Sequence, residues 1–192
     1  MKKNGGMTYI ELIVVLGIFA SMLSIAMYNH NKFQDKVSIK NLANEVALRI
    51  VEAQRSAMAG KASTAPFSSK PSYGVHFNLQ TDNKSFIYFA DFNASGSYSD
   101  PTFCNTVTGE CLAKITLNRA NTISNIAYYY SAGGPTTLNN LTVTFTRPAS
   151  DAAISSSTPP SSTVLYAQIT VASVSGTTAR IKIYPSGRIQ IN

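Results

Sequence analysis

The stretch from residue 7 to residue 28 constrains this chain more than any other part of it. It is almost purely apolar, it follows a short polar leader that contains two lysines, and Glu11 is its only charged residue. From Leu12 onward the stretch carries no charge, and about 20 apolar residues is the length that spans the ~30 Å hydrocarbon core of a bilayer. The sequence therefore predicts a membrane-spanning helix near its N-terminus.

Glu11 is the unusual residue of this stretch. On insertion scales, an ionisable side chain at the centre of a membrane helix costs roughly 2.5 to 3.5 kcal/mol, so such a residue usually has a partner or a task. One interpretation places Glu11 near the end of the span, where its carboxylate reaches headgroups or water. The other gives the carboxylate a role in assembly.

The residues around Glu11 support the second interpretation. The segment GGMTYIEL, residues 5–12, resembles the class III signal sequence of type IV prepilins and type II secretion pseudopilins. This resemblance implies that a prepilin peptidase cuts after Gly6 and that the new amine of Met7 is methylated. It also implies that Glu11 of one subunit faces the amine of a neighbouring subunit, so that each buried charge has a partner.

The helix is expected to continue beyond the membrane, because no proline occurs before Pro66. From Ile39 to Ile50, apolar residues recur in steps of three and four, which predicts one amphipathic helix with Gly60 as its C-cap. A coiled-coil stem would show the same periodicity. Docking on a sheet is favoured because the apolar stripe lasts fewer than three heptads and strand patterns follow at once.

The rest of the chain reads as β-structure. Alternating apolar and polar residues separated by turn residues predict strands at 73–79, 85–90, 113–118, 122–130, 141–147, 164–174, 178–184 and 188–191. In the fifth of these, Val143 and Phe145 are expected on the opposite face from Thr142, Thr144 and Thr146. Residues 148–162 offer little to bury and are predicted to form a surface loop.

These patterns predict an α+β fold. A long N-terminal helix, membrane-spanning in its first half and amphipathic in its second, packs on an antiparallel sheet or on two sheets. The expected parts are a leader at 1–6, a transmembrane and assembly helix at 7–28, an amphipathic helix at 29–60 and a β-rich domain at 61–192.

Three segments narrow the resemblance. Residues 44–57, 73–77 and 186–189 are similar to the minor pseudopilin group that includes the H component of type II secretion and the FimT-type minor pilins. The resemblance implies a pilin fold. Many major pilins carry a proline in the middle of the membrane helix, whereas this segment has only Gly17, so local melting there is not assumed.

Cys104 and Cys111 have six residues between them and no histidine close by in sequence, which argues against a zinc site. In an exported domain, this spacing predicts a disulfide that closes a small loop. Two free thiols are the alternative. The low charged content of 13% fits an exported β-rich domain, whose surface is polar through hydroxyl and amide groups.

One segment resembles the first half of a calcium loop. Asp91, Asn93 and Ser95 stand at ligand positions 1, 3 and 5, with a glycine at position 6. Position 12 is Thr102 where a calcium loop has a bidentate glutamate, and Asp100 is the nearest substitute. A turn rich in Asp and Asn is therefore the favoured interpretation, so no cofactor is predicted, and binding of Ca²⁺ is the alternative.

A basic group lies near the C-terminus of this chain, whose net charge is +7. Arg180 and Lys182 are expected on one face of a strand, and Arg188 follows the next turn, so three cations are placed to meet phosphates. Some FimT-type minor pilins bind DNA through a terminal Gly-Arg-x-Arg motif. Here the motif is Gly-Arg-Ile-Gln, without the second arginine, and a solvated strand face is the favoured alternative.

Catalytic motifs are absent from the sequence: there is no GxSxG, no HExxH and no glycine-rich phosphate loop. The sequence therefore predicts a structural subunit with no enzymatic activity. The resemblance implies that it sits in the cytoplasmic membrane with its C-terminal domain outside, and enters a pilus or pseudopilus. Its partners would be lipid, the prepilin peptidase, the assembly platform and other pilin or pseudopilin subunits.

Two other functional classes are alternatives to a structural subunit. A tip-located minor pilin would bind DNA or another ligand for uptake or adhesion. An ordinary signal peptide releasing a soluble enzyme is disfavoured because Glu11 lies within the apolar run. The sequence does not distinguish secretion, motility and DNA uptake.

Overall fold

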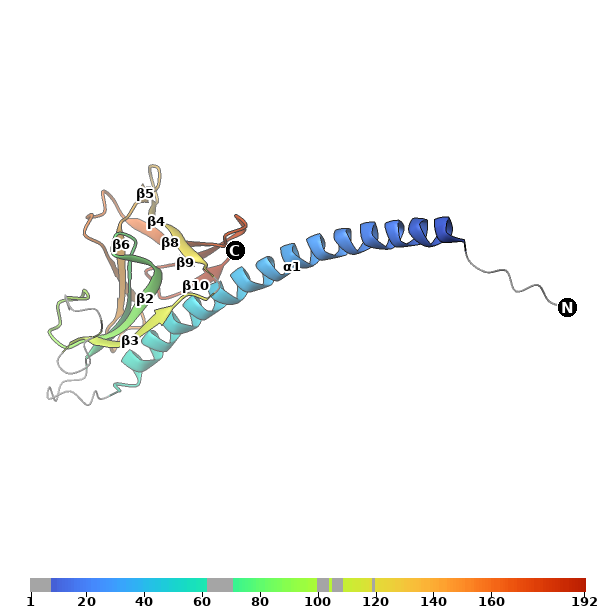
Figure 1. The fold of residues 1–192 in the computed structure, drawn as a ribbon. Helices are drawn as coiled ribbons and strands as arrows, with labels where there is room; N and C mark the ends of the chain where they lie inside the picture. The colour runs from blue at the N-terminus through green and yellow to red at the C-terminus, as the bar shows by residue number, and fades with distance from the viewer. Residues whose placement is uncertain (1–7, 62–70, 100–103, 105–108, 119) are drawn as a thin grey trace. The chain divides into compact units, whose positions relative to one another are not determined.

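A computed structural model describes residues 8–61, 71–99, 104, 109–118 and 120–192. Figure 1 shows one helix, α1 (Tyr9–Met58), followed by the strands of a C-terminal domain. The chain divides into two compact units, one ending at Ser38 and the other comprising Ile39–Asn192. The leader at 1–6 and the processing position Met7 lie outside the described residues.

Helix α1 has the length that the sequence predicts, 50 residues. It ends where the chain turns left-handed at Gly60, which has a φ of 56°. The amide of Lys61 donates to the carbonyl of Ser56 (3.1 Å), and the amide of Gly60 donates to that of Ala57 (3.0 Å). These two bonds form a Schellman motif, which satisfies carbonyl groups that the helix end would leave unpaired. The predicted C-cap is confirmed.

The strands form two five-stranded sheets in which all neighbouring strands are antiparallel. The first sheet has the order β3 (Cys111–Thr116), β2 (Asp82–Asp91), β1 (Ser72–Asn78), β6 (Asn140–Phe145) and β7 (Ala152–Ser155). The second has the order β10 (Ile189–Ile191), β9 (Thr178–Ile183), β8 (Val164–Ala172), β4 (Thr122–Tyr130) and β5 (Thr136–Thr137). An α+β chain with a long helix and two antiparallel sheets is therefore confirmed.

One hydrophobic core joins the second half of α1 to both sheets. The helix contributes the residues that the sequence assigns to its apolar stripe, Ile39, Leu42, Val46 and Ile50, all of which are buried. Full burial of each large aliphatic side chain stabilises the fold by about 1.5 to 3 kcal/mol. The sheets add the largest buried side chains, among them Tyr73, Phe77, Tyr128 and Phe145.

One sequence prediction is wrong beside β6. Residues 148–162 are not a continuous loop, because β7 lies within them and pairs with β6, with Ala152 opposite Phe145. This pairing depends on a neighbouring strand, which composition does not reveal. Both faces of β6 are covered, since Thr142 and Thr144 are buried as well as Val143 and Phe145. The segment after β2 covers this face of the first sheet, and the Thr144 hydroxyl donates to the carbonyl of Gly96 at 3.5 Å.

Candidate functional site

The first half of α1 presents an apolar surface that no other described residue covers. The large side chains between Tyr9 and Tyr28 are between 46% and 81% exposed. We call this the apolar segment. By length and composition it is sufficient to cross a membrane. A contiguous apolar surface of this extent marks a site of contact with lipid or protein.

The two serine hydroxyl groups of the apolar segment are satisfied within the helix. Ser21 donates to the carbonyl of Ile18 at 2.7 Å, and Ser24 donates to that of Ala20 at 3.0 Å. In hydrocarbon, an unsatisfied polar group costs several kcal/mol. Because both hydroxyl protons are already bonded to backbone carbonyls, the segment is compatible with an environment that offers no water.

The N-terminus of α1 places Glu11 in its first turn. Thr8 is the N-cap: its hydroxyl oxygen accepts from the amide of Glu11 (3.4 Å), and its carbonyl accepts from that of Leu12 (3.2 Å). The spacing Thr-x-x-Glu is that of a capping box. The positive end of the helix dipole favours a carboxylate here. Glu11 is exposed, and no ion pair within the described part of the chain involves it.

The predicted cations lie on the second sheet, where three tyrosines accompany two of them. The rings of Tyr129 and Tyr166 are stacked at 4.7 Å, and those of Tyr166 and Tyr184 lie 5.5 Å apart. Lys182 lies over the Tyr166 ring (4.9 Å), and the guanidinium carbon of Arg188 lies 3.9 Å from the centre of the Tyr184 ring. We call these five residues the tyrosine–cation face.

Arg180 lies on the same side of β9 as Lys182, but no ring contact within the described residues involves it. It is exposed on β9 opposite Thr170, and its backbone amide and carbonyl pair with Asn192. The sequence predicted the cations without the tyrosines, because the aromatic residues come from β4, β8 and the position directly after β9. Their alignment follows from a strand register that the sequence does not display.

The carboxylate of the candidate calcium loop binds its own backbone. Asp91 is 3% exposed, and its two oxygens accept from the amides of Ser95 (3.0 Å) and Gly96 (2.8 Å). Asn93 also accepts from the amide of Ser95, at 2.9 Å. These contacts describe a turn held by Asp and Asn side chains. Asp100 lies outside the described residues, and those that are described contain no cluster of three His, Cys, Asp or Glu side chains suited to a metal.

Sequence reasoning missed Glu110 as an anchor of the same segment. Its side chain is buried, and one carboxylate oxygen accepts from both the amide and the hydroxyl of Ser99, at 2.9 and 3.1 Å. The Ser99 hydroxyl in turn accepts from the side-chain nitrogen Nδ2 of Asn93 at 2.9 Å. Cys104 and Cys111, beside Glu110, are joined in a disulfide with their Cα atoms 4.8 Å apart.

A polar cavity of about 390 Å³ lies beside this segment. We call it the His76 pocket. It is lined by His76 of β1, by residues 95–98, by Asn140 and Thr142 of β6, and by residues 155–157. Burial lowers the pKa of His76 to about 4, so its imidazole is neutral at pH 7. The sequence does not indicate this pocket, because its walls come from four separate segments.

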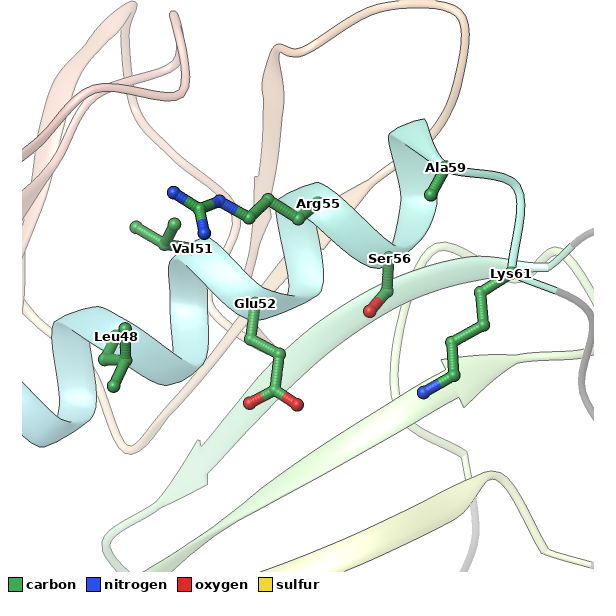
Figure 2. A pocket seen from close by; sticks show the side chains of 7 residues that line it. All are labelled: Leu48, Val51, Glu52, Arg55, Ser56, Ala59 and Lys61. Atoms are coloured by element: carbon green, nitrogen blue, oxygen red, sulfur yellow. The ribbon is translucent and has the colours of Figure 1, made fainter.

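A second cavity, of about 560 Å³, lies along the last turns of α1. Figure 2 shows the side chains that line it, which extend from Leu48 on the helix to Lys61 beyond the cap. Leu48 is exposed at the rim, and Glu52 pairs with Arg49 across one helical turn at 2.8 Å. An exposed ion pair of this kind contributes only a few tenths of a kcal/mol.

No family model matches this chain, and no curated protein or solved structure matches it either.

Proposed function

We propose that this chain is a structural subunit of a type IV pilus or a type II secretion pseudopilus, made as a prepilin and processed after Gly6. Before assembly it would be held in the cytoplasmic membrane by the apolar segment, with its β-rich domain outside. The observation that carries the proposal is the apolar segment itself, whose side chains are exposed along its whole length.

The continuity of helix α1 supports the proposal that this chain is a pilin or pseudopilin subunit. Helix α1 includes both the apolar segment and the residues from Ile39 to Ala57 that belong to the hydrophobic core. A cleavable signal peptide has no need for such continuity. In a subunit that is anchored and then stacked, the same helix first contacts lipid and afterwards contacts neighbouring helices, and a pilin fold has this organisation.

Glu11 would supply the specificity of stacking. After cleavage, the amine of Met7 lies four residues before Glu11, or about 6 Å along a helix. An axial offset between two subunits brings the carboxylate of one opposite the amine of the next. A buried charge without a partner is strongly unfavourable, so a helix bundle accepts the register that pairs them.

The test compares Glu11→Gln with Glu45→Gln, a matched control on the same helix. We expect both variants to insert in the membrane and to be processed. Only Glu11→Gln should fail to enter filaments, measured as the ratio of filament-bound to membrane-bound protein. Mass spectrometry should find that the mature chain begins at methylated Met7. Normal incorporation of Glu11→Gln, or a mature chain that retains its leader, would refute the proposal.

The tyrosine–cation face favours a second function, binding of single-stranded nucleic acid by a minor subunit. Cations interleaved with aromatic rings are the pattern that meets phosphates and stacks bases. Lys182, Tyr166, Tyr184 and Arg188 provide this pattern on one sheet. Neither cation belongs to an ion pair within the described ranges, so both remain available for phosphates.

Titration of a fluorescent oligonucleotide at several salt concentrations tests this second function. The double variant Lys182→Ala, Arg188→Ala should bind more weakly and reduce the slope of log K against log salt by about 1.4, or about 0.7 per lost phosphate contact. Lys84→Ala with Arg147→Ala removes the same charge elsewhere and should change little. Equal losses in both double variants would leave only non-specific attraction to a basic protein.

A further inference from the structure

The His76 pocket is built from parts that are fixed by the fold. His76 and Thr142 are directly opposed on β1 and β6, and their side chains lie 2.8 Å apart from Nδ1 to Oγ1. On the other side, the Ser155 hydroxyl donates to the carbonyl of Gly96 at 3.4 Å, which ties β7 to the loop over the sheet. The ring of Tyr98 lies 5.2 Å from that of His76.

Asn140 organises the far wall of the pocket. Its side-chain oxygen accepts from the hydroxyl of Ser156 (2.9 Å) and from both the amide (2.8 Å) and the hydroxyl (3.0 Å) of Ser157. Within the described residues, no hydrogen bond uses the side-chain nitrogen of Asn140. The hydroxyls of Ser156 and Ser157 donate their protons in these bonds, and their oxygens keep lone pairs that can accept further hydrogen bonds. The wall therefore offers N–H donors and hydroxyl acceptors together.

The chemistry of this lining selects against two classes of ligand. The lining contains no Asp, Glu, Lys or Arg, and burial lowers the pKa of His76 to about 4, which leaves its imidazole neutral at pH 7. An ion would lose hydration without meeting an opposite charge. An apolar ligand would bury the side-chain nitrogen of Asn140 without a hydrogen-bond partner.

We propose that the His76 pocket binds a neutral polyhydroxylated ligand, a mono- or disaccharide unit of a surface glycan. Each sugar hydroxyl donates one hydrogen bond and accepts others, which matches the mixed donors and acceptors around Asn140. Tyr98 and His76 both line the pocket, and their aromatic rings are side chains against which a sugar ring can pack. The volume of about 390 Å³ falls near the lower end of the ~300–1,000 Å³ typical of small-molecule sites.

This inference does not depend on filament assembly. All residues of the pocket belong to the unit Ile39–Asn192, and neither the apolar segment nor Glu11 contributes to it. A subunit that fails to stack would still bind the sugar, and one that stacks would carry the site on its β-rich domain.

The chain contains two histidines, and they make the test internally controlled. The full chain with ¹³C-labelled histidine is placed in a detergent without a sugar headgroup, and glucose, galactose, N-acetylglucosamine and maltose are titrated in. We expect at least one sugar to shift the His76 ring signals saturably and to leave those of His30 unchanged. A His30→Gln variant assigns the two sets of signals. Inorganic phosphate and glucuronate are the charged comparisons.

Two variants separate binding in the pocket from binding elsewhere. Ser157→Phe places a ring at the rim of the pocket and should raise Kd at least about tenfold, whereas Ser175→Phe, in the exposed turn after β8, should not change it. Thr142→Val keeps the side-chain volume but removes the hydroxyl beside His76, and should also weaken binding. The proposal is overturned if none of the four sugars moves the His76 signals, if phosphate or glucuronate moves them equally, or if Ser157→Phe binds as the parent does.

Discussion

His76 and Thr142 form a cross-strand pair in which the imidazole Nδ1 and the hydroxyl Oγ1 lie 2.8 Å apart. The pair is fixed by the register of β1 and β6, and the loop after β2 lies over the face on which it stands. Polar but uncharged groups therefore surround the histidine, and burial keeps its imidazole unprotonated at pH 7.

This enclosure makes the stability of the protein depend on pH. The unfolded chain protonates His76 below pH 6.5, whereas the folded chain does so only near pH 4. The unfolded state therefore binds more protons in between, and the free energy of unfolding falls as pH is lowered from 6.5 to 4. Since each pH unit corresponds to about 1.4 kcal/mol, the expected loss is about 3 kcal/mol.

Urea unfolding at several pH values, followed by tyrosine circular dichroism, measures this loss. His76→Gln removes the titrating group and should make the dependence of the unfolding free energy on pH shallower over the same interval. Carboxylates elsewhere titrate in both proteins, so their contribution cancels in the comparison. If parent and variant show the same decline between pH 6.5 and 4, the histidine is not responsible.

Two helix residues give a matched pair for the core. Ile50 is 0% exposed and Leu48 is 63% exposed, although only one residue separates them. Ile50→Ala leaves a cavity and should lower the free energy of unfolding by about 2 to 5 kcal/mol. Leu48→Ala should change it by less than about 0.5 kcal/mol. Thermal unfolding of both variants in the same detergent tests the difference, and similar losses would contradict the assigned face of the helix.

Gly187 combines a left-handed backbone with a close contact. Its φ is 79°, and a Cβ there would meet the carbonyl oxygen of Ser150 and the Gln54 side chain. Gly176 has a φ of 83° but open space around it. Both alanine variants should lose about 1 to 2 kcal/mol to backbone strain. Gly187→Ala should lose at least about 1 kcal/mol more, because overpacking adds to the strain. Equal losses would show that the contact relaxes freely.

The disulfide closes a short loop, and its removal should have a modest effect. For a sequence separation of 7 between Cys104 and Cys111, chain entropy predicts about 2 kcal/mol of stabilisation. The double variant Cys104→Ala, Cys111→Ala should lose about this amount, measured by chemical denaturation. A reducing agent should destabilise the parent protein and leave the variant unchanged. A parent protein that is insensitive to reduction would contradict the bond.

The sequence was sufficient for those elements whose signals are local. The helix could be predicted because its signals, the spacing of apolar residues and the absence of proline, are contained in one segment of the chain. Gly60 marks its end. Strand β4 was predicted with the bounds that the structure has, 122–130. Strand β7 was missed because its four residues are ordered by β6 and carry little apolar surface of their own.

The candidate sites follow the same division. Glu11 and the cysteine pair could be named from short motifs. The tyrosines beside Lys182 and Arg188, and the walls of the His76 pocket, come together only through strand register and a loop folded back over a sheet. Such proximity depends on contacts between distant segments, and no window of the sequence contains it.

The internal bonds of Ser21 and Ser24 have a consequence for how the apolar segment changes surroundings. Because these two serine protons are already bonded to carbonyls of the same helix, neither bond has to break when lipid tails are exchanged for the side chains of another helix. Under the proposed function, the reversibility of that exchange would then depend on one electrostatic contact, between the Glu11 carboxylate and the Met7 amine of a neighbouring subunit. The rest of the apolar segment would pack equally well against lipid or against another helix.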